Sequence, residues 1–104
     1  MKYMPLAKLE VFDPTLVNLA AFAKALAHPA RIMILQYLSG KGELACMSIV
    51  NALPLSQPAC SRHINELRKA GILKSRTRSN NVFFRIDEST LSQFCHEMKK
   101  TLQP

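Results

Sequence analysis

The sequence predicts a mainly α-helical domain with one small β-hairpin, and three observations support this fold class. Through residues 14–70, apolar residues recur every three or four positions, which is the period of a helix packed on one face. After Gly71 the period changes to two, as expected for strands, and the helical period returns over residues 89–102. We assign residues 1–104 to a single domain, because 104 residues are too few for two cores of ordinary size.

Two helices are predicted in the first forty residues. The first covers residues 14–27, where Asp13 can cap the helix and Pro14 suits its first position. The second covers residues 29–38, because Pro29 disfavours helical geometry in the residue before it. The four residues that follow include two glycines and predict a loop.

Two further helices, separated by a short turn at residues 53–55, are predicted at the centre of the chain. The third covers residues 43–52. The fourth begins after Ser56, which can cap it, and ends at Gly71, where glycine adopts the left-handed conformation common at helix ends. Its apolar face carries Cys60, Ile64 and Leu67. Its opposite face carries small polar and basic side chains, namely Ser61, Arg62, Asn65 and Lys69.

The last third of the chain predicts two strands and a helix. The strands cover residues 72–76 and 82–86, and the turn at residues 79–81 contains asparagines, which tolerate positive φ. The final helix covers residues 89–102. It carries an apolar stripe made of Leu91, Phe94, Cys95, Met98 and Leu102.

Positive charge is concentrated in one third of the chain. The net charge is +7, from 14 Lys and Arg against 7 Asp and Glu. Residues 56–86 contain seven of the basic residues and one acidic residue, Glu66, and so carry +6 of this charge. Such a stretch indicates a polyanionic partner. A solvated basic surface would show the same balance, whereas a membrane surface is less favoured because the stretch is not one amphipathic helix.

The predicted order of helix, short turn, helix and basic hairpin is that of a winged helix-turn-helix. Residues 43–71 would form the helix-turn-helix, and residues 72–86 would form the wing. A helix fits the major groove of double-stranded DNA, where its outward side chains reach base edges and phosphates. The candidate DNA-binding residues are Ser56, Gln57, Ser61, Arg62, His63, Asn65, Lys74, Arg76 and Arg78.

These candidates differ in their expected roles. Gln57 and Arg62 can form paired hydrogen bonds to adenine and guanine respectively, with phosphate contact as the alternative for Arg62. Ser56 is expected mainly to cap its helix. His63 lies beside the core face, so a partly buried structural role is its alternative. For the basic residues of the wing, the alternative to phosphate or minor-groove contact is solvated surface charge.

These residues resemble those of the ArsR/SmtB-type winged-helix repressors of bacteria. The resemblance extends from Leu16 to Phe94 and is carried by several short motifs. The most specific are His28-Pro29-Ala30-Arg31, Leu55-Ser56-Gln57 followed by Ser61-Arg62-His63, Leu67-Arg68-Lys69-Ala70-Gly71, and Phe83-Phe84-Arg85-Ile86.

The resemblance implies a homodimeric transcriptional repressor that binds a palindromic operator. In such proteins the N-terminal and C-terminal helices form the dimer interface, which corresponds here to residues 6–27 and 89–102. The residues expected at this interface are Leu16, Leu19, Leu91, Phe94, Cys95, Met98 and Leu102. The alternative is that the apolar stripe of the last helix packs only within one protomer.

The arsenic-sensing members of the family have two cysteines, one residue apart, after a Glu-Leu pair. Here Glu43-Leu44 is followed by Ala45 and Met47 at the two ligand positions. Cys46 occupies the position between them and is expected to point into the core, as free cysteines often do. We therefore expect no metal at this position.

The zinc-sensing members use Asp, His and Glu ligands on the last helix. Asp87 matches the first of these, but Ser89 stands where a histidine would follow. We therefore expect no metal site and no cofactor. Cys95 could act as a thiol sensor or pack at the dimer interface, and the sequence leaves the inducer open, whether a small molecule or a redox signal.

Other function classes fit the sequence less well. It contains no nucleophile–base set and no glycine-rich phosphate loop, so an enzyme is not expected. No apolar run reaches the roughly 18 residues that a membrane span needs. Three widely spaced cysteines do not form a disulfide scaffold and fit a reducing cytoplasm. The alternative function is a winged-helix interaction module that binds protein or RNA without specific recognition of a duplex.

Overall fold

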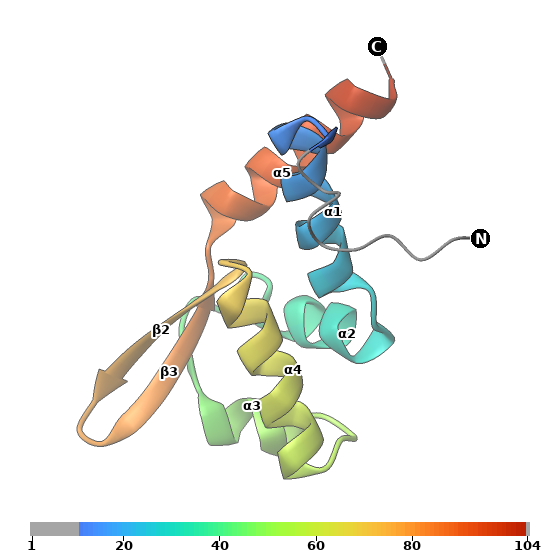
Figure 1. Ribbon diagram of the computed structural model, residues 1–104. Coiled ribbons are helices and arrows are strands. Elements are labelled where there is room, and N and C mark those ends of the chain that lie inside the picture. Colours follow the sequence, from blue (N-terminus) through green and yellow to red (C-terminus); the bar gives the residue numbers. More distant parts are fainter. Residues whose placement is uncertain (1–10, 104) are drawn as a thin grey trace.

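The computed structural model describes residues 11–103, which form five helices and three short strands (Figure 1). In chain order these are α1 (Pro14–Leu26), α2 (Pro29–Leu38), β1 (Leu44–Ala45), α3 (Cys46–Ala52), α4 (Gln57–Lys69), β2 (Leu73–Arg78), β3 (Asn81–Ile86) and α5 (Glu88–Leu102). The predicted mainly helical fold with a basic hairpin is confirmed. Residues 6–10 of the expected N-terminal dimer helix lie outside the described residues.

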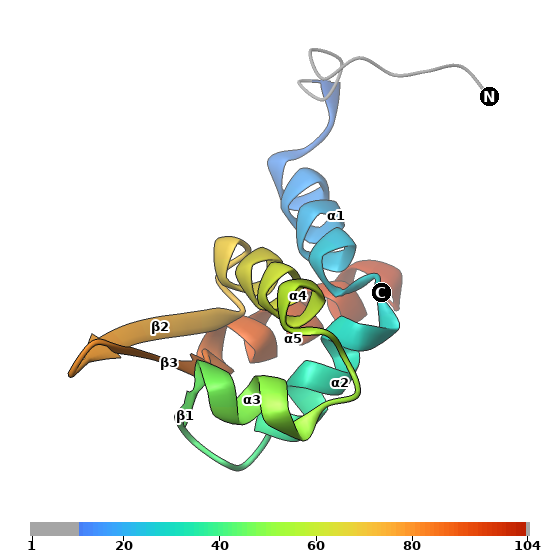
Figure 2. The same cartoon turned by 90° about the horizontal axis from the view of Figure 1, so that it is seen from below.

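The elements form a body and a projecting pair of helices. In Figure 1, α2, α3, α4 and the sheet make the body, while α1 and α5 project from its upper end. The same body is seen from below in Figure 2, with the hairpin extending to one side of α4. None of the described helices is both long enough and apolar enough to cross a membrane.

The sheet is antiparallel with the strand order β1-β3-β2. Its hairpin turn is shorter than predicted, because β2 extends to Arg78 and β3 begins at Asn81, one residue earlier than expected. The two residues between them, Ser79 and Asn80, adopt positive φ values of 51° and 65°. A two-residue turn in which both residues have positive φ has a twist that matches the right-handed twist of the paired strands. The turn therefore directs β2 and β3 out of the body as a narrow wing.

The predicted third helix begins later than expected. Leu44 and Ala45 are extended and pair with Phe84 and Phe83 of β3, so the helix starts at Cys46 and not at Glu43. This pairing satisfies backbone groups of β3 that would otherwise form an open sheet edge. The helix-turn-helix is thus preceded by a short strand that ties it to the wing.

The core lies beneath α4. The predicted apolar face of this helix is confirmed, because Cys60, Ile64 and Leu67 are all buried. They pack with Ile34 and Leu38 of α2 and with other apolar residues of the body. Burial of this face fixes the rotation of α4, so the side chains on its opposite face project outward.

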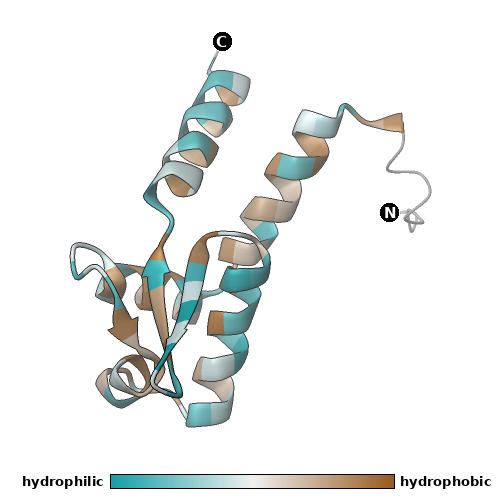
Figure 3. Cartoon of the chain, turned by 90° about the vertical axis from the view of Figure 1, so that its left-hand side faces the viewer, coloured by the Kyte–Doolittle hydropathy of each residue, from teal (hydrophilic) through white to brown (hydrophobic). Residues whose placement is uncertain are grey.

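α5 is attached to the body in a different way. Leu91 packs against the core from the first part of α5, and the ring of Phe94 stacks on that of Phe22 in α1 at a centroid distance of 4.3 Å. No residue of α5 is fully buried within the protomer. In Figure 3, α1 and α5 both rise above the body, and both carry hydrophobic segments.

Candidate nucleic-acid interface

The first turns of α4 present a polar surface to solvent. The Ser56 side chain caps the helix, with its Oγ accepting a hydrogen bond from the Ala59 backbone N–H at 3.3 Å. Gln57, Ser61 and Arg62 are all exposed. Pro58 has no backbone N–H, and the Ala59 N–H is already bonded, so the backbone at this helix start offers little to a phosphate. The first turns of α4 therefore present side chains for contact with bases and phosphates.

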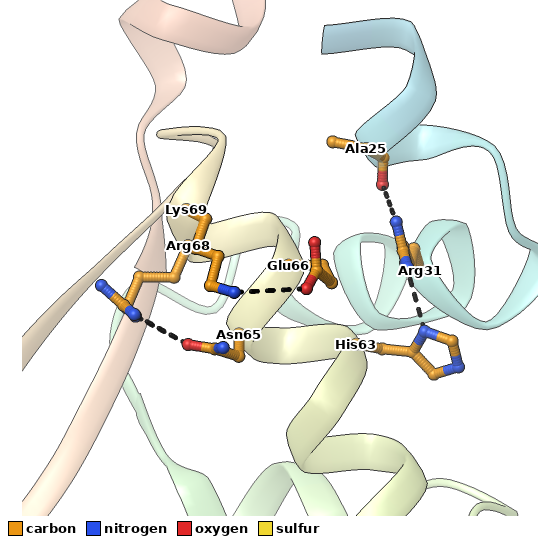
Figure 4. A network of polar contacts seen from close by, with 7 residues as sticks. All are labelled: Ala25, Arg31, His63, Asn65, Glu66, Arg68 and Lys69. Atoms are coloured by element: carbon orange, nitrogen blue, oxygen red, sulfur yellow. Dashed lines mark hydrogen bonds and ion pairs between the residues drawn. The ribbon is translucent and has the colours of Figure 1, made fainter. Parts of the chain in front are cut away.

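Further along α4, the polar side chains already have partners. Asn65 is half-buried, and its Oδ1 accepts hydrogen bonds from Arg68 Nε at 3.3 Å and Nη2 at 2.7 Å (Figure 4). Lys69 Nζ lies 3.6 Å from Glu66 Oε1. Within the described residues Arg62 has no acidic partner, so its guanidinium is the most available charge on this helix.

His63 was predicted to contact the DNA groove, but the structure buries it, so it has the structural role that the sequence offered as the alternative. Its side chain faces inward and is 8% exposed, and its Nδ1 accepts a hydrogen bond from Arg31 Nε at 3.1 Å (Figure 4). The ring also packs on that of His28, with centroids 4.3 Å apart. His63 lies at the edge of the apolar face of α4, and contact with α2 covers it.

The surroundings of His63 favour its neutral form. Burial lowers the pKa of this imidazole, and the nearby His28, Arg31 and Arg62 lower it further because they repel a second positive charge. The bond from Arg31 requires an Nδ1 without a proton, which agrees with a neutral ring. His63 thus holds α4 against α2.

The basic side chains of the wing are exposed but differ in whether they have an acidic partner. Arg76 Nη2 forms an ion pair with Glu43 Oε1 at 2.7 Å, and Lys74 Nζ lies 3.8 Å from Asp87 Oδ2. Near the tip, the Arg78 guanidinium lies over the Phe83 ring, 4.6 Å from its centroid, with no acidic partner in the described part of the chain. Arg78 is therefore the freest of the three cations predicted to contact DNA.

The start of α4 and the wing project from the same end of the molecule. In Figure 1 the hairpin tip and the first turn of α4 both lie at the lower end, and the projecting parts of α1 and α5 lie at the upper end. Figure 3 gives the same arrangement from the side. One extended partner can therefore touch the polar face of α4 and the basic wing together.

Sequence reasoning missed two features of this surface. Glu43, assigned to the start of a helix, instead supplies the carboxylate that holds Arg76. Ser48 and Asn51 of α3 are exposed, and they share one polar face of a helix whose buried residues are Ile49 and Val50. Their spacing of three residues was a signal that could have identified that face.

The cysteines are all free, and their environments differ. Cys60 is buried and Cys46 is partly buried, and this burial raises the pKa of both thiols. Neither thiol has the lowered pKa typical of a reactive cysteine. Cys95 is exposed on α5. Among residues 11–103, no three His, Cys, Asp or Glu side chains come together in a group that could hold a metal ion.

Comparison with known proteins places this geometry among DNA-binding regulators. A family model described as a helix-turn-helix domain matches residues 26–76, which extend from the end of α1 into β2. An arsenic resistance transcriptional regulator of Pseudomonas putida is 36% identical over 74% of this chain. The match covers 56% of that regulator, so the chain spans little more than half of its length.

Two further likenesses cover more of the compared proteins. A biofilm growth-associated repressor of Agrobacterium fabrum is 32% identical over 77% of this chain and 68% of its own length. Among solved structures, an ArsR-like transcriptional regulator from Rhodococcus superposes with a TM-score of 0.76 and 25% identity. That superposition covers 86% of this chain and 83% of the other.

Proposed function

The chain belongs to the ArsR-type family of winged helix-turn-helix transcriptional regulators, and from this premise we propose that it represses transcription by binding a palindromic operator as a homodimer. The observation that carries this proposal is the shared projection of the α4 start and the wing. Both elements bear exposed polar or basic side chains, and the opposite end of the molecule is left for assembly. We assign the protein to the cytoplasm, with no catalytic role.

In the proposed complex the two surfaces have different tasks. Gln57 and Arg62 read base edges in the major groove, because both side chains can form paired hydrogen bonds there. Ser56, Ser61 and the amide of Asn65 support this contact from the same helix. Lys74, Arg76 and Arg78 bind phosphates beside it. Arg76 exchanges its carboxylate partner Glu43 for a phosphate, so the wing is held in position before DNA arrives.

The homodimer is supported by the incomplete packing of α5. Leu16 of α1 is 46% exposed and Leu102 of α5 is 69% exposed. Phe94, Cys95, Met98 and Leu102 line an open hollow of about 550 Å³ on the outer side of α5. A two-fold axis through this surface would present two copies of α4 to successive turns of DNA, roughly 34 Å apart.

Two of the predicted interface residues contribute less than expected to this assembly. Leu19 is buried within the protomer, and Leu91 already packs against the core. Their side chains support the helices that carry the interface. The proposed contact is therefore centred on Leu16 and on the second half of α5.

Fluorescence anisotropy with labelled duplexes tests the proposal. The sequence upstream of the protein's own gene and a pool of random duplexes should yield a site that is bound more tightly than unrelated DNA. We expect log Kd to change with log salt by a slope of about 4 or more, because each neutralised phosphate releases a counterion.

Arg78→Ala and Lys100→Ala separate wing contacts from overall charge. Arg78→Ala should weaken binding to all sequences, whereas Lys100→Ala, at the opposite end of the molecule, should leave binding nearly unchanged. Binding to every duplex no tighter than to unrelated RNA would overturn the proposal and favour an interaction module.

A further inference from the structure

We propose that a cavity at the junction of α1, α2 and α4 binds a small organic carboxylate, and that its occupancy acts on α4 through Arg31. The cavity is open to solvent on one side, has a volume of about 530 Å³ and is lined by four alanines together with Lys24, His28, Arg31, Glu66 and Lys69. Pockets for small ligands commonly measure about 300–1,000 Å³. The binding step stands by itself, and the effect on DNA rests on the function proposed above.

Arg31 is the group expected to hold the carboxylate. It is partly buried, and Nε and Nη1 are fixed by hydrogen bonds to His63 Nδ1 and to the Ala25 carbonyl, both at 3.1 Å. A guanidinium has five N–H groups, so three of these have no partner among the described residues. No carboxylate of the described chain lies within ion-pair distance of it. A held guanidinium with spare donors is pre-organised for a carboxylate.

The charges around the cavity select an anion. The lining contains Lys24 of α1 and Lys69 of α4 in addition to Arg31 of α2. Glu66 is the acidic residue of the lining, and Lys69 pairs with it at 3.6 Å (Figure 4). The lining therefore keeps an excess of positive charge. The alanine methyl groups supply an apolar wall, which favours a carboxylate with a short hydrocarbon body over a fully hydrated inorganic ion.

The cavity is separated from the proposed DNA surface. Twelve helical steps lie between Gln57 at the start of α4 and Lys69 near its end, which corresponds to about 18 Å along the axis. A carboxylate bound here would not occupy the position of the operator. Any effect of the bound carboxylate on DNA binding would therefore be transmitted along α4.

Arg31 is the residue that connects the cavity to α4. Its two hydrogen bonds connect α2 to the last turns of α1 and to the middle of α4 (Figure 4). A carboxylate on the unpartnered N–H groups would pull the guanidinium toward the cavity and so change the geometry of its bonds to His63 Nδ1 and the Ala25 carbonyl, and losing the donor of the buried His63 ring is unfavourable. Occupancy should therefore shift α4 relative to α1, the helix that we assign to the dimer interface.

Nuclear magnetic resonance titration of the full chain tests the binding step. Sodium benzoate is the probe, sodium phosphate is the comparison, and sodium chloride keeps the ionic strength constant. We expect benzoate to cause saturable shifts of the backbone amides of Ala25, Ala27, Arg31 and Ala70. Absence of saturable shifts at these amides, or saturation by phosphate with none by benzoate, would overturn the proposed ligand class.

Two double variants with the same loss of charge distinguish a site from general attraction. Lys24→Gln with Lys69→Gln should weaken benzoate binding by about tenfold, the loss of roughly 1.4 kcal/mol. Lys41→Gln with Lys100→Gln removes two lysines outside the cavity and should change it by less than about twofold. Equal weakening by both pairs would show that no defined site exists.

A final measurement joins the site to DNA binding. Operator affinity is measured with and without saturating benzoate, and we expect a change of about threefold or more that disappears in the Lys24/Lys69 variant. An unchanged operator affinity together with saturable binding would overturn the coupling through Arg31. If the protein binds no duplex at all, the proposed function fails, and the titration still decides whether the carboxylate site exists.

Discussion

α4 and α5 are both amphipathic helices of similar length, yet they differ in how much of each is buried within the protomer. Of the 13 residues of α4, Cys60, His63, Ile64 and Leu67 are buried. Of the 15 residues of α5, none is. The difference shows that α4 has its packing partners within one protomer, whereas the second half of the apolar stripe of α5 faces a space that the protomer leaves open. An amphipathic helix can therefore belong to a core or to an interface, and only tertiary structure distinguishes them.

The largest effect should come from the buried side of α4. Leu67 is 0% exposed, so Leu67→Ala should lower the free energy of unfolding by about 2–5 kcal/mol through lost burial and the cavity left behind. Urea denaturation of the protein measures this change. Leu102→Ala is the matched control on α5, and in dilute protein it should cost under about 1 kcal/mol. Similar losses for both variants would break the comparison.

The second effect concerns assembly through α5. Met98→Asp combined with Leu102→Asp places two charges on the proposed interface and should raise the dimer dissociation constant at least about tenfold. Sedimentation analysis gives the constant, and circular dichroism should show that the protomer keeps its helices. Ser92→Asp, an exposed change on the same helix, is the control. A dimer that survives the double change must use another surface.

The third effect belongs to the outer face of α4. Arg62→Ala should cost about 1–3 kcal/mol in binding the preferred operator and should relax the preference at one base pair. Competition with operators that carry each base at each position measures the preference. A uniform loss over all operators would mean that Arg62 binds phosphate and reads no base.

The fourth and smallest effect is the pH dependence of folding stability that His63, on the buried side of α4, should cause. The pKa of His63 lies below the ordinary histidine value because of burial and because of His28, Arg31 and Arg62. The unfolded chain therefore takes up a proton more readily than the folded one. Stability should be unaffected by His63 well above pH 6.5, should fall as pH drops below that value, and should level off below the folded pKa.

Urea denaturation at a series of pH values follows this change. His63→Asn keeps an acceptor for Arg31 without a titrating ring, so it should flatten the pH dependence between 7.5 and 5.5. His96→Asn replaces an exposed histidine on α5 and should leave the profile as it was. If the profile is the same in all three proteins, His63 is not the group that senses pH.

The parts of the fold that local pattern controls could be predicted from the sequence. Asp13, Ser56 and the prolines set helix starts, and the spacing of Cys60, Ile64 and Leu67 gave the buried face of α4. Asn80 indicated the wing turn because asparagine tolerates positive φ, although the other residue with positive φ is Ser79 and Asn81 belongs to β3. These features depend on residues within a few positions of one another.

Features that depend on distant partners could not be predicted in this way. β1 is two residues long and exists because β3, some forty residues later, pairs with it. His63 lies at the margin of an apolar face, and Arg31 and His28, more than thirty residues earlier, decide that it is buried. The pairing of Glu43 with Arg76 spans 33 positions. The spacing of apolar residues along the sequence does not indicate contacts between residues so far apart.

The exposed second half of α5 also has a consequence for how the protein would respond to its own abundance. If this surface is completed by another copy, the population of paired molecules rises with the square of the protomer concentration when protomers predominate. Occupancy of a two-fold operator would then increase more steeply than synthesis of the chain. A threshold in gene dosage would follow from unsatisfied apolar area on one helix, without any dissolved signal.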